Sequence, residues 1–86
     1  MQNMIVVKTT KSKVDEILNN HVRYVVLKDS KRYHIDDYLF LQEYDKYGDF
    51  TGRVVHGRIS HIACPVTLHN YSILSFTLVD FYELQT

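Results

Sequence analysis

The fold is decided by residues 36–55, which read DDYLFLQEYDKYGDFTGRVV. Tyr38 to Tyr44 is dense in aromatic and branched residues, a composition typical of β-strands. Asp45-Lys-Tyr-Gly-Asp supplies turn residues, with Gly48 free to take a positive φ, and the extended pattern resumes from Thr51 to Ile62. The stretch therefore predicts two strands joined by a tight turn in a β-hairpin.

Length and composition indicate one globular domain. The 86 residues suffice for a single core but leave no room for two domains, so we expect residues 1–86 to fold as one unit. Ten basic and ten acidic side chains cancel. The whole molecule therefore has no field that attracts a nucleic acid or an anionic membrane, and any polyanion site must be a local patch.

The single cysteine, Cys64, indicates the redox state of the cellular compartment in which the protein resides. Cys64 has no partner for an internal disulfide, and a free thiol fits a reducing environment, so we expect the protein in the cytoplasm. We also expect Cys64 to be a small buried residue rather than a nucleophile. The apolar run from Met4 to Val7 ends at Lys8 and is too short for a signal peptide or a membrane span. It predicts a first strand, Met4 to Lys8.

A short helix is predicted next, ending at about Asn20. Thr10 or Ser12 can cap its first turn. Apolar residues at i, i+3 and i+4 give it one narrow stripe for burial, formed by Val14, Ile17 and Leu18. The pair Asn19-Asn20 predicts a left-handed stop.

Two further segments have strand patterns. Val22 to Lys28 is apolar on both faces, which predicts a strand in the middle of the sheet or barrel. Ser72 to Leu84 alternates in the period of a half-buried strand. The order is β-α-β-β-β-β. We therefore predict an α+β fold, mostly β, whose strands curl into a small, partly open barrel capped by one helix, since closure hides strand edges.

Four motifs carry a resemblance to a known family. They are VDEILNN (14–20) in the helix, KRYHIDD (31–37) before the third strand, and LFLQEYD (39–45) and FTGR (50–53) in the hairpin. Together they resemble the small proteins of the ASCH superfamily, whose barrel is similar to the PUA RNA-binding domain. Within it they are most similar to an uncharacterised bacterial and phage family, domain of unknown function 3850. The resemblance covers roughly Val6 to Ile62 and implies a PUA-like barrel.

Departures from this family bear on catalysis. Relatives follow the helix with a glycine, a lysine, and then a glutamate and an arginine that line a cleft beneath the helix. This chain has Asn20 for the glycine, Val22 (or, shifted by one, Arg23) for the lysine, and Val25 and Leu27 for the other two. Some ASCH proteins hydrolyse acetylated cytidine with a lysine and a threonine from this segment and a later glutamate, and aliphatic side chains cannot take such roles. The resemblance implies a cleft without its charges, so we expect no catalytic residues and no enzyme.

No metal or cofactor is expected. His56 and His61 are five apart in one predicted strand and so point to opposite faces, and Cys64 is not spaced from them like a zinc ligand. Asp36 and Asp37 can be interpreted as a catalytic acid pair. Carboxylates before a strand more often bond turn amides, which is the interpretation we prefer.

The remaining signal is a basic and aromatic patch. It comprises Lys28, Lys31, Arg32, Tyr33 and His34 around one loop, Arg53, His56 and Arg58 on the fourth strand, and Arg23. Lysine and arginine neutralise phosphates while tyrosine or histidine stacks on an unpaired base, which is how single-stranded RNA is generally held. We therefore expect a non-catalytic module that binds RNA or another nucleic acid. A solvated loop without a partner is the competing interpretation.

Two other functions stay open. Aromatic surface at the hairpin tip and beside the last strand can serve a homodimer or docking to another protein, as in a module of a phage or mobile element. The residues concerned are Tyr44, Tyr47, Phe50 and Tyr71. A nucleoside-amide hydrolase related to the ASCH amidohydrolases is the less favoured alternative.

Overall fold

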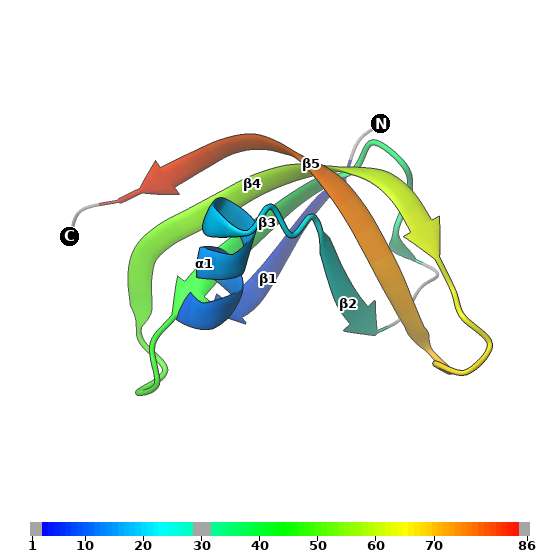
Figure 1. The fold of residues 1–86 in the computed structure, drawn as a ribbon, viewed down its shortest axis with the longest axis horizontal. Helices are drawn as coiled ribbons and strands as arrows, with labels where there is room; N and C mark the ends of the chain where they lie inside the picture. Colours follow the sequence, from blue (N-terminus) through cyan, green and yellow to red (C-terminus); the bar gives the residue numbers. More distant parts are fainter. Residues whose placement is uncertain (1–2, 29–31, 85–86) are drawn as a thin grey trace.

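The chain folds as one curled sheet with a helix beneath it (Figure 1). The computed structural model describes residues 3–28 and 32–84. Its elements in chain order are β1 (Met4–Thr10), α1 (Lys11–Asn19), β2 (Tyr24–Lys28), β3 (Tyr38–Tyr44), β4 (Phe50–Ala63) and β5 (Tyr71–Glu83). The predicted order β-α-β-β-β-β is confirmed, and so is the predicted class of a mostly β fold with one helix in the described residues.

β3 and β4 form the predicted hairpin. They pair antiparallel, with Phe40 opposite His56. Asp45 closes the turn, because its N–H donates to the carbonyl of Asp49 (2.9 Å) and its own carbonyl accepts from the N–H of Gly48 (3.0 Å). Gly48 has φ +86°, a left-handed conformation that glycine adopts without strain.

The sheet has the strand order β1-β3-β4-β5-β2. β1 runs parallel to β3, and the other neighbouring pairs are antiparallel. β4 and β5 are 14 and 13 residues long and bend along their length, so the sheet arches into a half-barrel (Figure 1). β1 and β2 lie at opposite edges and do not pair with each other, which leaves the barrel partly open, as predicted.

The prediction that the second strand lies in the middle of the sheet is wrong. β2 pairs with β5 alone and forms an edge of the sheet. Val25 is buried, whereas Tyr24 and Val26 on the other face are 48% and 46% exposed. The strand also begins two residues later than predicted, because His21 takes φ 56° and residues 21–23 turn the chain. An apolar run of this length is therefore compatible with an edge strand.

The helix begins at the predicted cap and ends differently. The hydroxyl of Thr10 accepts from the N–H of Lys13 (3.2 Å), which makes Thr10 the N-cap. Asn20 has φ −110°, so the predicted left-handed asparagine is wrong. The left-handed residue is His21, one position further along the chain.

The core lies between α1 and the concave side of the sheet. From the predicted stripe, Val14 and Ile17 are fully buried. The sheet contributes the other buried members of this core cluster, namely Val25, Leu39, Leu41, Val55, Ile59, Leu74 and Phe76. Each such burial stabilises the fold by about 1.5–3 kcal/mol, so this packing holds α1 in a fixed place over the sheet. Within the described residues no helix has the length and apolar character to cross a membrane.

Candidate functional site

The fold spreads the predicted cationic patch over the whole sheet. Lys28 lies at the end of β2, opposite Tyr71 at the start of β5. Arg53 lies on β4 opposite Glu83, at the other end of β5, and Arg58 lies between these two positions. Almost the full length of β5 therefore separates Lys28 from Arg53, so the structure does not bring Lys28, Arg53 and Arg58 together.

Two of the predicted arginines are engaged within the protein. The guanidinium of Arg23 donates to the backbone carbonyl of Ile17, in the last turn of α1, and to that of Val22 in the following connection. Arg58 pairs with Asp36 at 3.3 Å between Nε and Oδ1, with the two side chains 46% and 59% exposed. Arg58 thus keeps access to solvent, whereas Arg23 has a structural role.

The loop that carries the other predicted residues is described in part. Lys31 lies outside the described residues, and Arg32 is exposed. Tyr33 is half-buried, and its hydroxyl donates to the carbonyl of Lys28. The ammonium of Lys28 lies 5.9 Å from the ring centroid of Tyr71. A lysine and two tyrosines do therefore meet at this end of the sheet.

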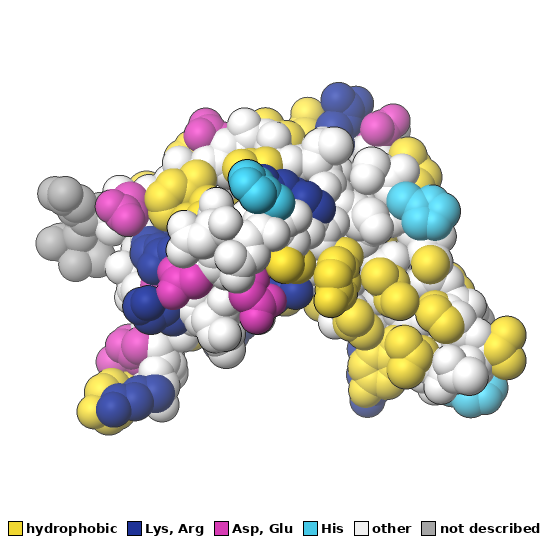
Figure 2. All heavy atoms as spheres, in the orientation of Figure 1, with side chains coloured by type: hydrophobic (Ala, Val, Ile, Leu, Met, Phe, Trp, Pro, Cys, Tyr) yellow, Lys and Arg dark blue, Asp and Glu magenta, His cyan; other side chains and the backbone are white. Residues whose placement is uncertain are grey.

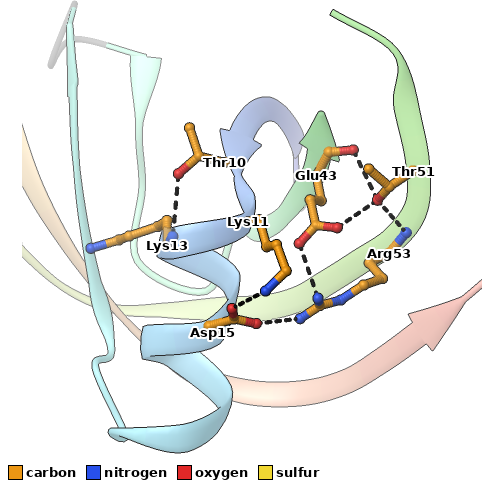
Figure 3. A network of polar contacts seen from close by, with 7 residues as sticks. All are labelled: Thr10, Lys11, Lys13, Asp15, Glu43, Thr51 and Arg53. Atoms are coloured by element: carbon orange, nitrogen blue, oxygen red, sulfur yellow. Dashed lines mark hydrogen bonds and ion pairs between the residues drawn. The ribbon is translucent and has the colours of Figure 1, made fainter. Parts of the chain in front are cut away.

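A connected polar network lies at the opposite end, between α1 and the hairpin (Figure 3). The hydroxyl of Thr51 donates to Oε1 of Glu43 (2.7 Å), and Nη1 of Arg53 lies 3.3 Å from Oε2 of the same carboxylate. Nη2 of Arg53 donates to Oδ1 of Asp15 (3.0 Å). The ammonium of Lys11 donates to Oδ2 of Asp15 (2.7 Å). The network ties the first turns of α1 to both strands of the hairpin.

Burial and charge make this network rigid. The Glu43 carboxylate is almost fully buried, and Arg53 keeps 20% of its side chain exposed. Removing Arg53 would leave the buried Glu43 carboxylate without a cation among the described residues, which costs several kcal/mol in proteins, whereas removing Glu43 would leave Arg53 with Asp15 alone. The hydrogen bond from Lys11, and then the one from Arg53, lower the pKa of Asp15 below its usual value. Asp15 is therefore charged at neutral pH.

A hollow of about 440 Å³ lies next to the network. It is lined by Thr10, Lys11 and Ser12 at the start of α1, and by residues 43–46 and Thr51 of the hairpin. Its walls thus come from a helix cap and from a hairpin whose position the network fixes. A volume of this size lies in the range of small-ligand pockets, about 300–1,000 Å³.

Lysine and tyrosine side chains stand beside this hollow. The ammonium of Lys8 lies 4.8 Å from the ring centroid of Tyr44, and that of Lys46 lies 5.2 Å from the ring centroid of Tyr47. Tyr47 is 78% exposed. No carboxylate of residues 3–28 or 32–84 lies within ion-pair distance of Lys8 or Lys46. We call the hollow together with Lys8 and Tyr47 the hairpin-end site.

The segment after the helix does not line the hollow. Val25 is in the core and Leu27 packs against it, as their apolar character requires. The lining residues of the hollow come from other positions and include Lys11, Glu43 and Lys46. No pattern in residues 20–27 pointed to these lining residues. The Glu-Tyr-Asp and Thr-Gly-Arg motifs could have indicated the site from the sequence. They supply Glu43, Thr51 and Arg53 to the network and part of the lining of the hollow.

The other predicted chemical groups lie apart from this site. Cys64 is exposed, so the prediction that it is buried is wrong; it lies just beyond the end of β4, where the sheet no longer covers it. His61 is exposed, while His56 lies between the rings of Phe40 and Tyr82. Among the described residues, no cluster of histidine, cysteine and carboxylate side chains has the geometry to hold a metal ion.

Of the two aspartates before β3, Asp37 bonds backbone amides as predicted, whereas Asp36 forms an ion pair. Asp37 is buried, and its carboxylate accepts from the backbone N–H groups of Asn3 (3.1 Å) and His34 (3.0 Å). Asp36 has φ 74° and pairs with Arg58. Asp37 therefore fixes the approach to β3, as carboxylates before strands commonly do.

Fold and site together define a small half-barrel domain whose described residues include one helix, with a hollow at its hairpin end. Over residues 6–76 the chain matches one family model, Domain of unknown function (DUF3850), and it belongs to this family. A comparison with curated proteins finds no match.

Proposed function

We propose that this protein is a non-catalytic module that binds single-stranded RNA at the hairpin-end site. The observation that carries the proposal is the hollow of about 440 Å³ with Lys11 and Lys46 in its walls and the Lys8–Tyr44 pair beside it. Lysines attract phosphates, and an aromatic ring accepts an unpaired base by stacking. These are the two contacts that single-stranded nucleic acid requires.

The size of the hollow favours a single strand. It has room for one unstacked nucleotide, and protein recognition of RNA sequence generally uses such splayed-out bases rather than the duplex. The nearby carboxylates do not compete for the lysines on the outside of the site. Oδ1 of Asp45 accepts from the backbone N–H groups of Tyr47 (2.9 Å) and Asp49 (3.0 Å) within the turn. Lys8 and Lys46 thus remain available to phosphates.

Binding is better supported than hydrolysis. A general base must reach the proton that it removes. Glu43 is 2% exposed, and its two carboxylate oxygens lie 2.7 Å from the Thr51 hydroxyl and 3.3 Å from Nη1 of Arg53. Lys11 is held by Asp15. The network therefore acts as a frame for the site, with its acid and base groups occupied by one another.

The wider expectations from the sequence belong to the same proposal. Placement of the family in the ASCH superfamily, with a barrel like that of the PUA RNA-binding domain, would suit the half-barrel and its RNA site. A phage or mobile-element role fits the same resemblance. The free Cys64 favours the cytoplasm, since an unpaired exposed thiol suits a reducing compartment.

The experiment compares two double variants in their binding to RNA. A fluorescently labelled single-stranded RNA of mixed sequence is titrated with protein, and anisotropy is followed at several salt concentrations. We expect Lys8→Ala with Lys46→Ala to weaken binding at least about tenfold at low salt, and to reduce the salt slope by about 1.4, because each phosphate contact on a single strand contributes about 0.7. The matched control is Lys31→Ala with Arg32→Ala in the loop after β2.

The outcomes separate the competing interpretations. A loss confined to the Lys31 and Arg32 variant would move the RNA site to that loop. Absence of salt-sensitive binding by the wild type, together with recovery of a nuclease-resistant protein partner, would favour the protein-interaction module. Hydrolysis of acetylated cytidine that is lost in Thr51→Ala would replace the binding module by an enzyme.

A further inference from the structure

β1 is an open edge of the sheet. It pairs with β3 on one side, and no other strand of the described sheet lies on its other side (Figure 1). Its side chains alternate between half-buried and exposed. Met4 and Val6 point away from the core and are 69% and 58% exposed. The strand therefore presents both backbone groups and apolar side chains at the sheet edge.

This edge lacks the usual protection against pairing. Natural edge strands carry prolines, bulges or several charges that discourage another strand from adding. The β1 sequence MIVVKTT contains no proline and has Lys8 as its one charged residue. Its register with β3 runs without a shift from Met4 to Thr10. The opposite edge, β2, is shorter, with five residues.

An apolar stripe crosses the outer face of the sheet and ends at this edge. Val6 lies opposite Phe40 on β3. The Phe40 ring stacks on His56 of β4, with centroids 4.3 Å apart and planes at 15°, and His56 faces Tyr82 of β5 at 6.3 Å. Both ring nitrogens of His56 are buried and have no hydrogen-bond partner in the described residues, so the imidazole acts as part of the stripe. At β1 the stripe stops at an exposed valine.

We propose that two copies of this protein pair through β1, antiparallel, about a two-fold axis at Val6. This register places Val6 opposite Val6 of the second copy and Met4 opposite its Lys8, so no like charges face each other. On the inner face Ile5 lies opposite Val7 of the second copy. The two outer stripes join at the valines into one continuous apolar band.

The observations favour a second copy over another partner. The strand is complementary to itself in this register, and a two-fold contact closes after two copies. The chain has zero formal net charge, so two copies do not repel each other as charged proteins would. Pairing of β1 with β2 of another copy would instead continue without closing, and would produce filaments rather than dimers.

The test measures molar mass by sedimentation velocity over a range of protein concentrations. We expect the wild type to reach dimer mass. Val6→Lys and Val6→Glu should each dissociate it, raising the dissociation constant at least about tenfold, because like charges then face each other where two valines met. An equimolar mixture of the two variants should recover dimer mass, since lysine then faces glutamate. The matched control is Val66→Lys, at a residue that is 85% exposed in the β4–β5 loop.

Each other result overturns the dimer. Wild type that stays monomeric at the highest concentration removes the proposal, as does a dimer that survives in both Val6 variants. Mass that grows beyond the dimer with concentration would indicate the open-ended pairing. Circular dichroism verifies folding of each variant, and exposure of Val6 predicts little change in stability. Val6 lies outside the hairpin-end site, whereas Lys8 belongs to both surfaces, so both sets of variants are measured in both assays. Loss of RNA binding with dimer mass retained, or the reverse, separates the failure of one proposal from that of the other.

Discussion

The two ends of the half-barrel carry similar residues in different settings. Each end places a lysine over a tyrosine, Lys8 over Tyr44 at the hairpin end and Lys28 over Tyr71 at the β2 end. At the hairpin end, charged side chains of both signs gather around α1, whereas hydrophobic side chains gather over β2 and the neighbouring parts of β4 and β5 (Figure 2). A hollow with a buried ionic frame accompanies the lysine–tyrosine pair at the hairpin end.

The difference between the two ends shows that residue types alone do not define a binding site. A lysine over a tyrosine contributes only about 0.5–1 kcal/mol when it is exposed, and it occurs at both ends. Recognition needs walls that keep their position while a ligand binds, since an ordered site loses less entropy on binding. The link from Lys11 through Asp15 and Arg53 to Glu43 provides such walls at the hairpin end.

The largest expected loss of stability comes from Gly52→Ala, at the hairpin end. Gly52 has φ +98°, and an added Cβ would lie 2.1 Å from the carbonyl oxygen of Leu84. The same glycine accepts a hydrogen bond from the N–H of Leu84 (2.6 Å), so the clash cannot relax without losing that bond. We expect the free energy of unfolding to fall by more than about 3 kcal/mol, from backbone strain and overpacking together. Urea denaturation followed by circular dichroism measures it.

Gly48→Ala is the matched control for this substitution. Gly48 also has a positive φ, +86°, but an added Cβ would meet nothing within 4 Å. Only the conformational cost of about 1–2 kcal/mol then applies. Equal losses in the two variants would contradict the close approach of the chain end to Gly52.

The next largest effect is expected from Glu43→Ala. This change removes the buried carboxylate partner of Arg53, which keeps the more exposed Asp15, and leaves the Thr51 hydroxyl the backbone carbonyl of residue 43 in place of a charged acceptor, so we expect a loss of about 3 kcal/mol. The matched control is Arg58→Ala, which breaks the exposed pair with Asp36 and should cost less than about 1 kcal/mol. A similar cost for both variants, measured by urea denaturation, would mean that the ionic frame at the hairpin end adds no rigidity.

Much of the fold could be predicted from the sequence because local signals agreed with one another. The hairpin was predicted within one residue at each end of its strands, since its turn chemistry and its strand composition point to the same structure. The place of β2 could not be predicted. An apolar pattern reports hydrophobicity, whereas the position of a strand in the sheet depends on which other strands pair with it.

The candidate site was harder to predict because its members are far apart in the sequence. Asp15 and Arg53 are separated by 38 positions and meet only through the packing of α1 against the sheet. Arg53 was predicted to be a cation for RNA, because its carboxylate partners Glu43 and Asp15 are brought to it only by the fold. Lys8 and Lys46 were overlooked for the same reason, since neither lies in a basic cluster along the chain.

The smallest expected effect concerns the pKa of Asp15. Its folded-state pKa is lowered, chiefly by the hydrogen bond from Lys11. The charged carboxylate therefore stabilises the fold above the pKa of the unfolded chain, near 4, and this stabilisation is lost as the pH falls through the lower folded value. Lys11→Met removes the main cause, so the pKa of Asp15 should rise toward its usual value, as followed by NMR of the carboxyl carbon. Lys46→Met, which removes a lysine that does not contact Asp15, should leave the titration unchanged. If Lys11→Met also leaves it unchanged, Lys11 does not hold the outer end of the network, and the hairpin end loses part of what distinguishes it from the β2 end.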